Sequence, residues 1–226
     1  MGKNNSISPV NRASLTDQVL NNLRQAILNG KLKPGQRIIE EDVAAMMQTS
    51  RGPVRDALIQ MEHEGLVIRN RNCGSVVANP SSEDMEEVWS LRVVLENMAL
   101  RYAVQRATET DIARLEQCVQ RLGGCLRKNF SLKRAVDLDL KIHEELMNIS
   151  RHKRLISVWQ GLKSQIWFLI FSRNVFDEAG FPRDSDVEHR KLISAIRKKN
   201  LAQGTEHLKT HLGSAYTRLL KTYKRK

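Results

Sequence analysis

Apolar residues recur at every third or fourth position along most of the chain, a pattern that predicts a mostly α-helical protein. A first helix is predicted from Leu15 to Gly30, where leucine, valine and isoleucine repeat at a spacing of four residues. A second helical run begins near Glu40. A third spans residues 51–64 and stops at Gly65, because glycine commonly ends a helix. The first third of the chain therefore contains three helices in succession.

Two extended segments follow the third helix. Residues 66–69 and 75–78 are rich in valine and isoleucine and flank a turn at 70–74, which is typical of a β-hairpin. Ile38 and Ile39 can pair briefly as a further strand. Three helices followed by a hairpin are the elements of a winged helix-turn-helix, whose third helix enters the major groove of DNA.

The rest of the chain is predicted to be helical throughout. Six helices are expected over about 83–107, 108–128, 132–150, 153–175, 184–199 and 201–222. Together they predict an all-α six-helix bundle. A polar run around Pro80 marks the boundary before it. The expected organisation is a flexible arm at 1–13, a winged helix-turn-helix domain at 14–79, a linker at 80–83 and a helical domain at 84–226.

Charge and composition narrow the class of protein. The 37 Lys and Arg residues exceed the 25 Asp and Glu residues, giving a formal net charge of +12, which favours a polyanionic partner such as nucleic acid. A hydrophobic content of 41% with only 5 Pro excludes a disordered chain. The three cysteines lack zinc-site spacing and fit a reducing cytoplasm. No stretch approaches the ~20 apolar residues of a membrane span, and the start lacks the apolar core of a signal peptide, so we expect a cytoplasmic protein without a membrane partner.

The start of the third helix carries side chains suited to DNA. Ser50, Arg51, Gly52 and Arg55 lie at the helix end that meets the major groove in this architecture. An arginine there can donate two hydrogen bonds to a guanine edge, and first-turn backbone amides can bind a phosphate. Most surface arginines are only solvated or ion-paired, but the position of these beside a predicted wing favours contact with DNA.

The predicted wing carries two further arginines. Arg69 and Arg71 bracket the hairpin, where they either contact phosphates or only keep the hairpin soluble. Elsewhere, Met46, Met47 and Met61 are interpreted as core packing. The aromatic residues of one C-terminal helix are interpreted as core or pocket wall; they are Trp159, Trp167, Phe168 and Phe171.

The N-terminal motifs resemble a known family. The segments Leu32-Lys-Pro-Gly-Gln-Arg-Ile38 and Ser50-Arg-Gly-Pro-Val-Arg-Asp-Ala-Leu58 are similar to the DNA-binding domain of GntR-family bacterial transcription regulators, over residues 15–78. The resemblance implies that Arg51 and Arg55 contact bases and phosphates. It also places Ser50 on the DNA backbone and Gly74 at the wing tip near the minor groove. The family often has an arginine where this chain has Glu41, and a basic residue or histidine where it has Cys73.

Five of the six histidines lie beyond residue 140, and two pairs have a spacing compatible with metal binding. Asp139 and His143 are four residues apart and share a helix face, as do His207 and His211, while His189 lies on the helix between. A carboxylate with two or three imidazoles suits Zn, Ni, Mn or Fe and leaves coordination positions open. Histidines on amphipathic helices also fill ordinary polar roles, so the spacing alone leaves both interpretations open.

The motifs around these histidines look like the FCD effector domain of one GntR subfamily, over roughly residues 83–220. They are Asp139-Leu-Lys-Ile-His143, Glu188-His-Arg-Lys-Leu-Ile-Ser-Ala-Ile196 and Leu208-Lys-Thr-His-Leu212. The resemblance implies that a divalent metal is bound by Asp139, His143, His189 and His211. That metal helps hold a small organic acid or related effector. Arg92 corresponds to an arginine lining the effector cavity; alternatively, it forms only a surface ion pair with Glu96.

The combined expectation is a ligand-responsive, DNA-binding transcription regulator rather than an enzyme, released from DNA when a carboxylate effector binds. The resemblance implies a homodimer, and two-fold symmetry then predicts an inverted-repeat operator. One alternative is a metal-dependent hydrolase or lyase that activates water at the Asp/His cluster. No Ser/His/Asp, Cys/His or glycine-rich phosphate motif accompanies that cluster. A second alternative is a helical adaptor that holds proteins together, which would leave the arginines of the third helix unexplained. Salt-dependent binding to duplex DNA separates the three functions.

Overall fold

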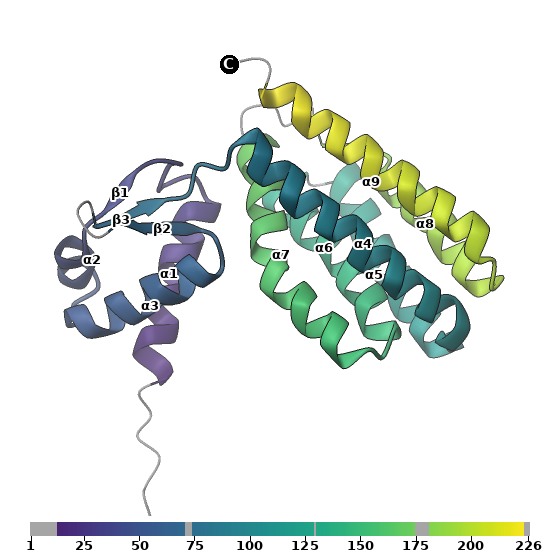
Figure 1. The fold of residues 1–226 in the computed structure, drawn as a ribbon, viewed down its shortest axis with the longest axis horizontal. Helices are drawn as coiled ribbons and strands as arrows, with labels where there is room; N and C mark the ends of the chain where they lie inside the picture. Colours follow the sequence, from purple (N-terminus) through teal and green to yellow (C-terminus); the bar gives the residue numbers. More distant parts are fainter. Residues whose placement is uncertain (1–12, 71–73, 129, 175–180, 224–226) are drawn as a thin grey trace, which may run out of the picture. The chain divides into compact units, whose positions relative to one another are not determined.

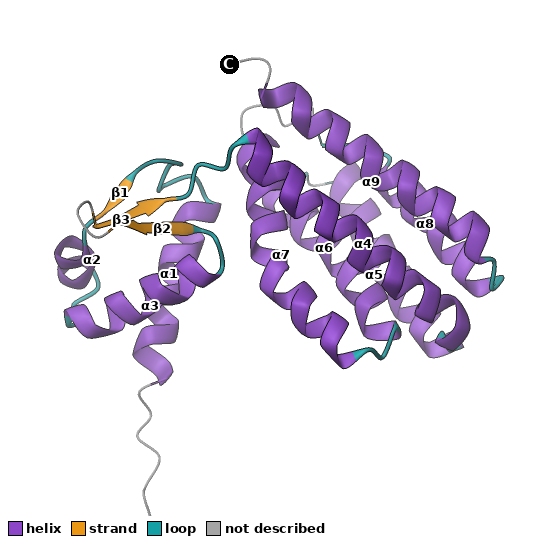
Figure 2. Ribbon diagram, in the orientation of Figure 1, coloured by secondary structure: helices purple, strands orange, loops and turns teal. Residues whose placement is uncertain are grey.

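The computed structural model describes residues 13–70, 74–128, 130–174 and 181–223 of the 226-residue chain. The chain divides into two units that meet in sequence between Ala78 and Asn79. Helices dominate both units, and a small sheet lies in the first (Figure 1 and Figure 2). The predicted mostly α-helical fold class is confirmed.

The first unit is a winged helix-turn-helix. Its elements are α1 (Ala13–Leu28), β1 (Arg37–Ile38), α2 (Glu40–Met46), α3 (Arg51–His63), β2 (Val67–Asn70) and β3 (Gly74–Val77). The strands form an antiparallel sheet in the order β1-β3-β2, so the brief strand expected at Ile38 pairs with the hairpin. Ala13, which was expected in the arm, is the first residue of α1. Residues 1–12 of the expected arm lie outside the described residues.

The core of this unit follows the predicted apolar spacing. The buried side chains on the helices are Val19, Leu20, Leu23, Ile27, Val43, Ala44, Val54, Ala57, Leu58 and Met61. Met61 is fully buried as expected, but Met47 is half-buried and Met46 is 76% exposed. The short α2 packs only through the stripe that contains Val43 and Ala44, which leaves Met46 facing solvent. Core packing is therefore the wrong interpretation for Met46.

The turn between α2 and α3 has a defined geometry. Gln48 adopts a left-handed backbone conformation, with φ of 51°. Its N–H donates to the Ala45 carbonyl oxygen at 3.2 Å, and the Thr49 N–H donates to the Ala44 carbonyl oxygen at 3.0 Å. These bonds close the end of α2 in a Schellman motif and set the direction in which α3 begins.

The second unit is the predicted all-α bundle. Among its described residues, the six helices are α4 (Ser82–Arg106), α5 (Glu109–Arg127), α6 (Leu132–Ile149), α7 (Lys153–Asn174), α8 (Ser185–Arg197) and α9 (Leu201–Tyr223). Helix α6 packs against α4, α5 and α7, and α9 packs against α4 and α8. The four aromatic residues of α7 named above are buried, which confirms their assignment as core or pocket wall.

Local caps fix where the first of these helices begin. The Ser81 hydroxyl accepts from the Asp84 N–H at 3.1 Å, and the Asp84 carboxylate accepts from the Ser81 N–H at 2.7 Å, a capping box. Ser82 and Glu83, which were expected in the linker, therefore form the first turn of α4. Thr108 and Asp111 make the same reciprocal pair at the start of α5.

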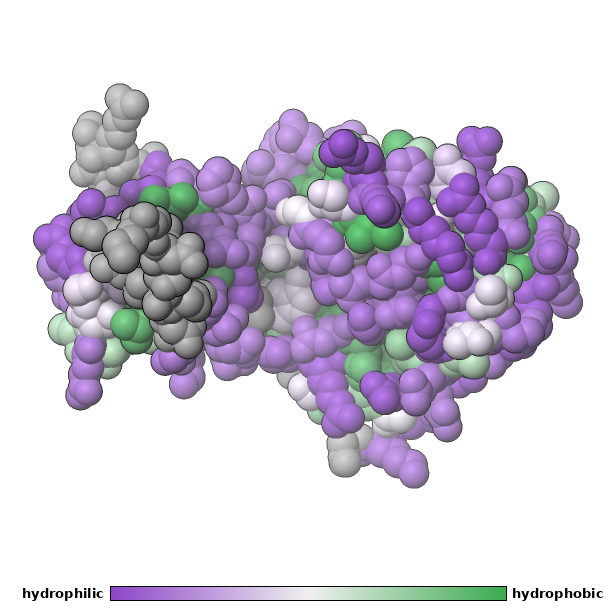
Figure 3. Space-filling view, turned by 90° about the horizontal axis from the view of Figure 1, so that it is seen from below, coloured by the Kyte–Doolittle hydropathy of each residue, from purple (hydrophilic) through white to green (hydrophobic). Residues whose placement is uncertain are grey.

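Hydrophilic side chains cover most of the surface drawn in Figure 3, and apolar side chains appear there in small separate patches. Among the described residues, no helix is long and apolar enough to cross a membrane. Cys118 is half-buried and Cys125 is buried, neither forms a disulfide with another described residue, and Cys73 lies outside the described residues.

Candidate metal centre and nucleic-acid interface

Four side chains from three helices of the second unit converge at one point. They are Asp139 and His143 on α6, His189 on α8 and His211 on α9, and all four are buried. Their ligand atoms lie within 4.8 Å of one another. The Nε2 atom of His143 is 3.3 Å from Nε2 of both His189 and His211. Bonds of about 2 Å to a shared ion would separate neighbouring ligand atoms by roughly 3 Å, so these donors fit one metal ion.

Two of the histidines are oriented through their second ring nitrogen. The Nδ1 atom of His143 lies 2.6 Å from Oε2 of Glu96 on α4. His189 Nδ1 lies 2.8 Å from the carbonyl oxygen of Ser185, which can only accept a hydrogen bond. His189 therefore carries its proton on Nδ1 and leaves the Nε2 lone pair directed at the cluster. Such outer partners hold metal-binding imidazoles in the required orientation.

Two histidines of the cluster, His189 and His211, are biased toward the neutral form that binds metals. Burial lowers the pKa of His189, although the nearby Asp139 carboxylate opposes this shift. Burial, together with the neighbouring histidines, lowers the pKa of His211 well below its ordinary value. Three imidazoles with one carboxylate suit a divalent transition metal, and the residues present fit such an ion. His207 is half-buried and lies outside the cluster.

Arg92 lies beside this cluster and is 1% exposed. Its Nε donates to Glu96 Oε1 at 2.6 Å, and its guanidinium lies 4.8 Å from the centre of the Trp89 ring. Its Nη2 is buried and has no hydrogen-bond partner among the residues that the structure describes. The ion pair with Glu96 therefore exists, but the expectation of a surface pair is wrong because both side chains face the bundle interior.

Glu96 connects Arg92 to the candidate metal ligands. Burial by itself would raise the pKa of this carboxyl group, but its interactions with His143 and Arg92, including a hydrogen bond to each, outweigh burial and lower the pKa to about 2. Glu96 is therefore a carboxylate at neutral pH. Sequence reasoning identified it only as the partner of Arg92. Its contact with His143 spans 47 positions in the chain, and no local spacing signals it.

The first unit gathers the predicted DNA-contacting residues at the start of α3. Ser50, Arg51, Gly52 and Arg55 are all exposed there. Ser50 occupies the N-cap position of α3, but its hydroxyl makes no capping hydrogen bond to the described residues. Gly74 begins β3 with φ of 74°, a conformation that favours glycine.

The arginines of the wing are only partly described. Arg69 is half-buried and lies 3.8 Å from Glu62, which is a weak ion pair. Arg71 lies outside the described residues. The expected contacts of the wing with phosphates therefore remain predictions.

Two acidic residues of α2 contact the arginines of α3. Glu41 Oε1 lies 2.8 Å from Arg51 Nη1, and Glu40 Oε2 lies 3.4 Å from Arg55 Nη2. These side chains, together with Arg37, line a hollow of about 240 Å³. Sequence reasoning missed both pairs because α2 and α3 are separated by a turn whose direction the local pattern does not specify. The arginines are thus both exposed and ion-paired.

Both units match models of known families. Residues 15–77 match the model of bacterial regulatory proteins of the gntR family, and residues 87–214 match the FCD domain. The chain therefore belongs to the GntR family of DNA-binding bacterial transcription regulators, in the group that carries an FCD domain.

The chain is similar over most of its length to regulators from several bacteria. It is 29% identical to the HTH-type transcriptional regulator McbR of Escherichia coli over 204 residues, which cover 86% of this chain and 87% of that protein. It is 26% identical to the gluconate operon transcriptional repressor of Bacillus subtilis over 199 residues, covering 85% and 80%. The solved structure of E. coli McbR/YncC shares the fold, with a TM-score of 0.75 at 22% identity, over 92% of this chain and 98% of that one. These relatives are transcription regulators, and none of them supports the hydrolase or lyase alternative.

Proposed function

We propose that the protein is a cytoplasmic repressor of transcription that leaves its operator when a small organic acid binds beside a metal in the FCD domain. The observation that carries this proposal is the convergence of one carboxylate and three imidazoles next to a buried guanidinium with an unpartnered nitrogen. Buried polar groups are normally hydrogen-bonded, so the free Nη2 of Arg92 beside the four candidate metal ligands indicates that a ligand binds there.

DNA recognition is assigned to the start of α3 and to the wing. Arg51 and Arg55 contact base edges and phosphates, and Ser50, whose hydroxyl is not used in capping, contacts the DNA backbone. Gly52 allows close approach of the helix end, because it carries no side chain. The DNA contacts of the wing are assigned to Arg69, Arg71 and Gly74.

The metal is assigned to Asp139, His143, His189 and His211. A divalent ion of Zn, Ni, Mn or Fe would supply positive charge that attracts a carboxylate oxygen of the effector. Arg92 contributes its free Nη2 as a second donor to that carboxylate. For this binding to regulate transcription, the effector must bind the DNA-free arrangement more tightly than the DNA-bound one.

The interface of a homodimer is assigned to the exposed face of α4. Leu91, Val94 and Met98 are 54%, 65% and 37% exposed and are spaced so that they form one apolar stripe. A two-fold symmetric contact through this stripe would present two reading helices to an inverted-repeat operator.

The decisive test is fluorescence anisotropy of the purified protein with duplex DNA from the region flanking its own gene. We expect tight, salt-dependent binding by the wild type and loss of at least tenfold in affinity for the double variant Arg51→Ala, Arg55→Ala. The matched control, Lys198→Ala with Lys209→Ala, removes the same charge from exposed positions of the second unit and should bind normally. Equal affinities for all three proteins would overturn the assignment of α3.

A further inference from the structure

We infer that the effector is a dianion, with one acidic group directed to the metal ligands and Arg92 and the second acidic group bound by Arg218 of α9. This inference rests on the effector site proposed above and specifies the chemical class of its ligand.

The cavity beside the cluster contains a second arginine that sequence reasoning did not single out. Arg218 follows His211 by seven residues, which is about two helical turns, so both side chains lie on the same face of α9. Both line one cavity, whose other polar residues are Arg92, Asp139 and Ser185. Two guanidinium groups thus line a cavity that also reaches the candidate metal ligands.

Neither guanidinium is fully satisfied by the part of the chain that the structure describes. The Nη2 atom of Arg92 is buried there without a partner. Arg218 is half-buried, and none of the carboxylate oxygens among the described residues lies within 4.0 Å of its guanidinium. Withdrawing an unpaired cation from water is costly, so a pair of such groups in one cavity indicates a place for negative charge.

The charges around the cavity set the charge of the ligand. Glu96 offsets Arg92, with which it is paired at 2.6 Å. Asp139 would offset one charge of a divalent ion held by the cluster and leave the other for the ligand. Asp139 and Asp184 attract the Arg218 guanidinium only through space, because no carboxylate among the described residues is in direct contact with it. A second acidic group on the ligand would give this half-buried guanidinium the direct partner that a monoanion cannot supply.

The small volume of the cavity indicates that the Arg218 side chain must move when a ligand enters. Its free volume is about 30 Å³, which is room for about two water molecules. The other polar residues of the lining are buried among packed helices and have little room to move. Arg218 is half-buried, and its long side chain lies near the end of α9, where it can move. A small diacid would therefore enter by displacing the Arg218 guanidinium and would bind to it.

The test is calorimetric titration of the zinc-loaded full-length protein with acids that differ by one acidic group. Lactate is compared with malate, and glycolate with phosphoglycolate, so that a second carboxylate and a phosphate are distinguished. We expect wild-type protein to bind malate, or phosphoglycolate, whose phosphate carries up to two charges at neutral pH, at least tenfold more tightly than the matching monoacid. Arg218→Gln should abolish the preference by weakening binding of the diacid to the level of the monoacid, while Lys209→Gln, exposed on the same helix, should retain it.

Zinc content and circular dichroism are measured for every sample, because diacids also chelate zinc in solution and a variant can misfold. A preference that persists in folded, zinc-loaded Arg218→Gln would overturn the inference, as would equal binding of mono- and dianions by the wild type. In both cases the proposed effector site would stand, because the acids bind. Absence of binding by any of the acids to a protein that retains its zinc would overturn the effector site itself, while leaving the DNA-binding assignment intact.

Discussion

Glu96 lies between His143 and Arg92 and contacts each of them with a different carboxylate oxygen, at 2.6 Å in both cases. All three side chains are buried. This chain of contacts joins a candidate metal ligand on α6 to the candidate effector residue on α4. A change in the position or charge of His143 can therefore be transmitted through Glu96 to the Arg92 guanidinium.

Replacing this carboxylate should weaken metal binding. In Glu96→Gln, one of the two partners would face an amide NH₂ group, which cannot accept a hydrogen bond. Because loss of an outer partner of a metal-binding histidine typically reduces affinity, we expect zinc to bind roughly 10- to 100-fold more weakly. Competition with a chromophoric chelator measures this. Glu87→Gln, at an exposed position of the same helix, should bind zinc like the wild type, and equal affinities for the two variants would contradict the assigned role.

The ion pair between Glu41 and Arg51 should limit binding to random DNA. Glu41→Gln removes a negative charge from the face that carries the reading arginines and releases Arg51 from its 2.8 Å contact. Exposed pairs contribute about 0.2–1 kcal/mol, so affinity for a random duplex should rise by up to about fivefold, with a smaller gain on the operator. Anisotropy at several salt concentrations measures both affinities. Glu109→Gln makes the same charge change at a position that is 84% exposed on α5 and should leave both values unchanged.

The apolar stripe on α4 should control oligomeric state. Val94→Glu places a charge at its most exposed position, which is 65% exposed. We expect the dimer to dissociate and operator affinity to fall at least tenfold, because the two half-sites would no longer be bound together. Sedimentation velocity and anisotropy measure the two effects. Val187→Glu changes an exposed valine on α8; if it dissociated the protein equally, or if Val94→Glu remained dimeric, the interface would lie elsewhere.

The helices could be predicted closely because their signals are local. The expected run 132–150 corresponds to α6 at Leu132–Ile149, and the run 201–222 corresponds to α9 at Leu201–Tyr223. Apolar periodicity, caps and breakers determine such bounds within a few residues. The start of α4 was placed at about residue 83 instead of Ser82, because two serines adjoin and only the pairing with Asp84 identifies Ser81 as the N-cap.

The candidate sites were predictable only in part. Spacing placed Asp139 and His143 on one helix face, but the meeting of three helices at that point came from the family resemblance. The partnership of Glu96 with His143, the acidic partners of Arg51 and Arg55, and the position of Arg218 were not predicted. Each depends on how separate helices pack against one another, which side-chain spacing within one helix does not specify.

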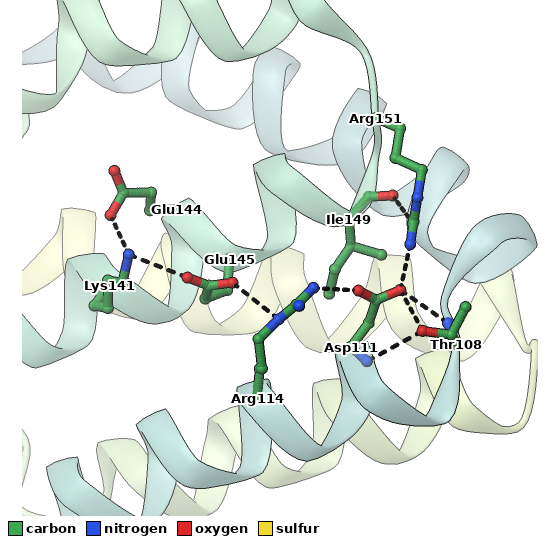
Figure 4. Close-up of polar contacts among 8 residues, drawn as sticks. All are labelled: Thr108, Asp111, Arg114, Lys141, Glu144, Glu145, Ile149 and Arg151. Atoms are coloured by element: carbon green, nitrogen blue, oxygen red, sulfur yellow. Dashed lines mark hydrogen bonds and ion pairs between the residues drawn. The ribbon is translucent and has the colours of Figure 1, made fainter.

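A network at the start of α5 should stabilise the second unit in a pH-dependent manner. Figure 4 shows Asp111 between Thr108, Arg114 and Arg151. Arg151 Nη2 donates to Asp111 Oδ2 at 2.7 Å, and the Thr108 N–H donates to the same oxygen at 2.9 Å. Burial would raise the pKa of Asp111, but these hydrogen bonds outweigh burial and lower the pKa from 3.8 to about 2.

A carboxyl group with a lowered folded-state pKa contributes stability above its unfolded pKa and loses that contribution as the pH falls through the folded value. Asp111→Asn should therefore destabilise the second unit by about 1–2 kcal/mol at neutral pH, and the difference from wild type should shrink between about pH 4 and pH 2. Urea unfolding of the full-length protein, followed by circular dichroism at several pH values, measures this difference. Asp17→Asn, at an exposed position of α1, is the control and should match the wild type at every pH. A difference that stays constant down to pH 2 would mean that the stabilisation comes from packing of Asp111 rather than from its charge.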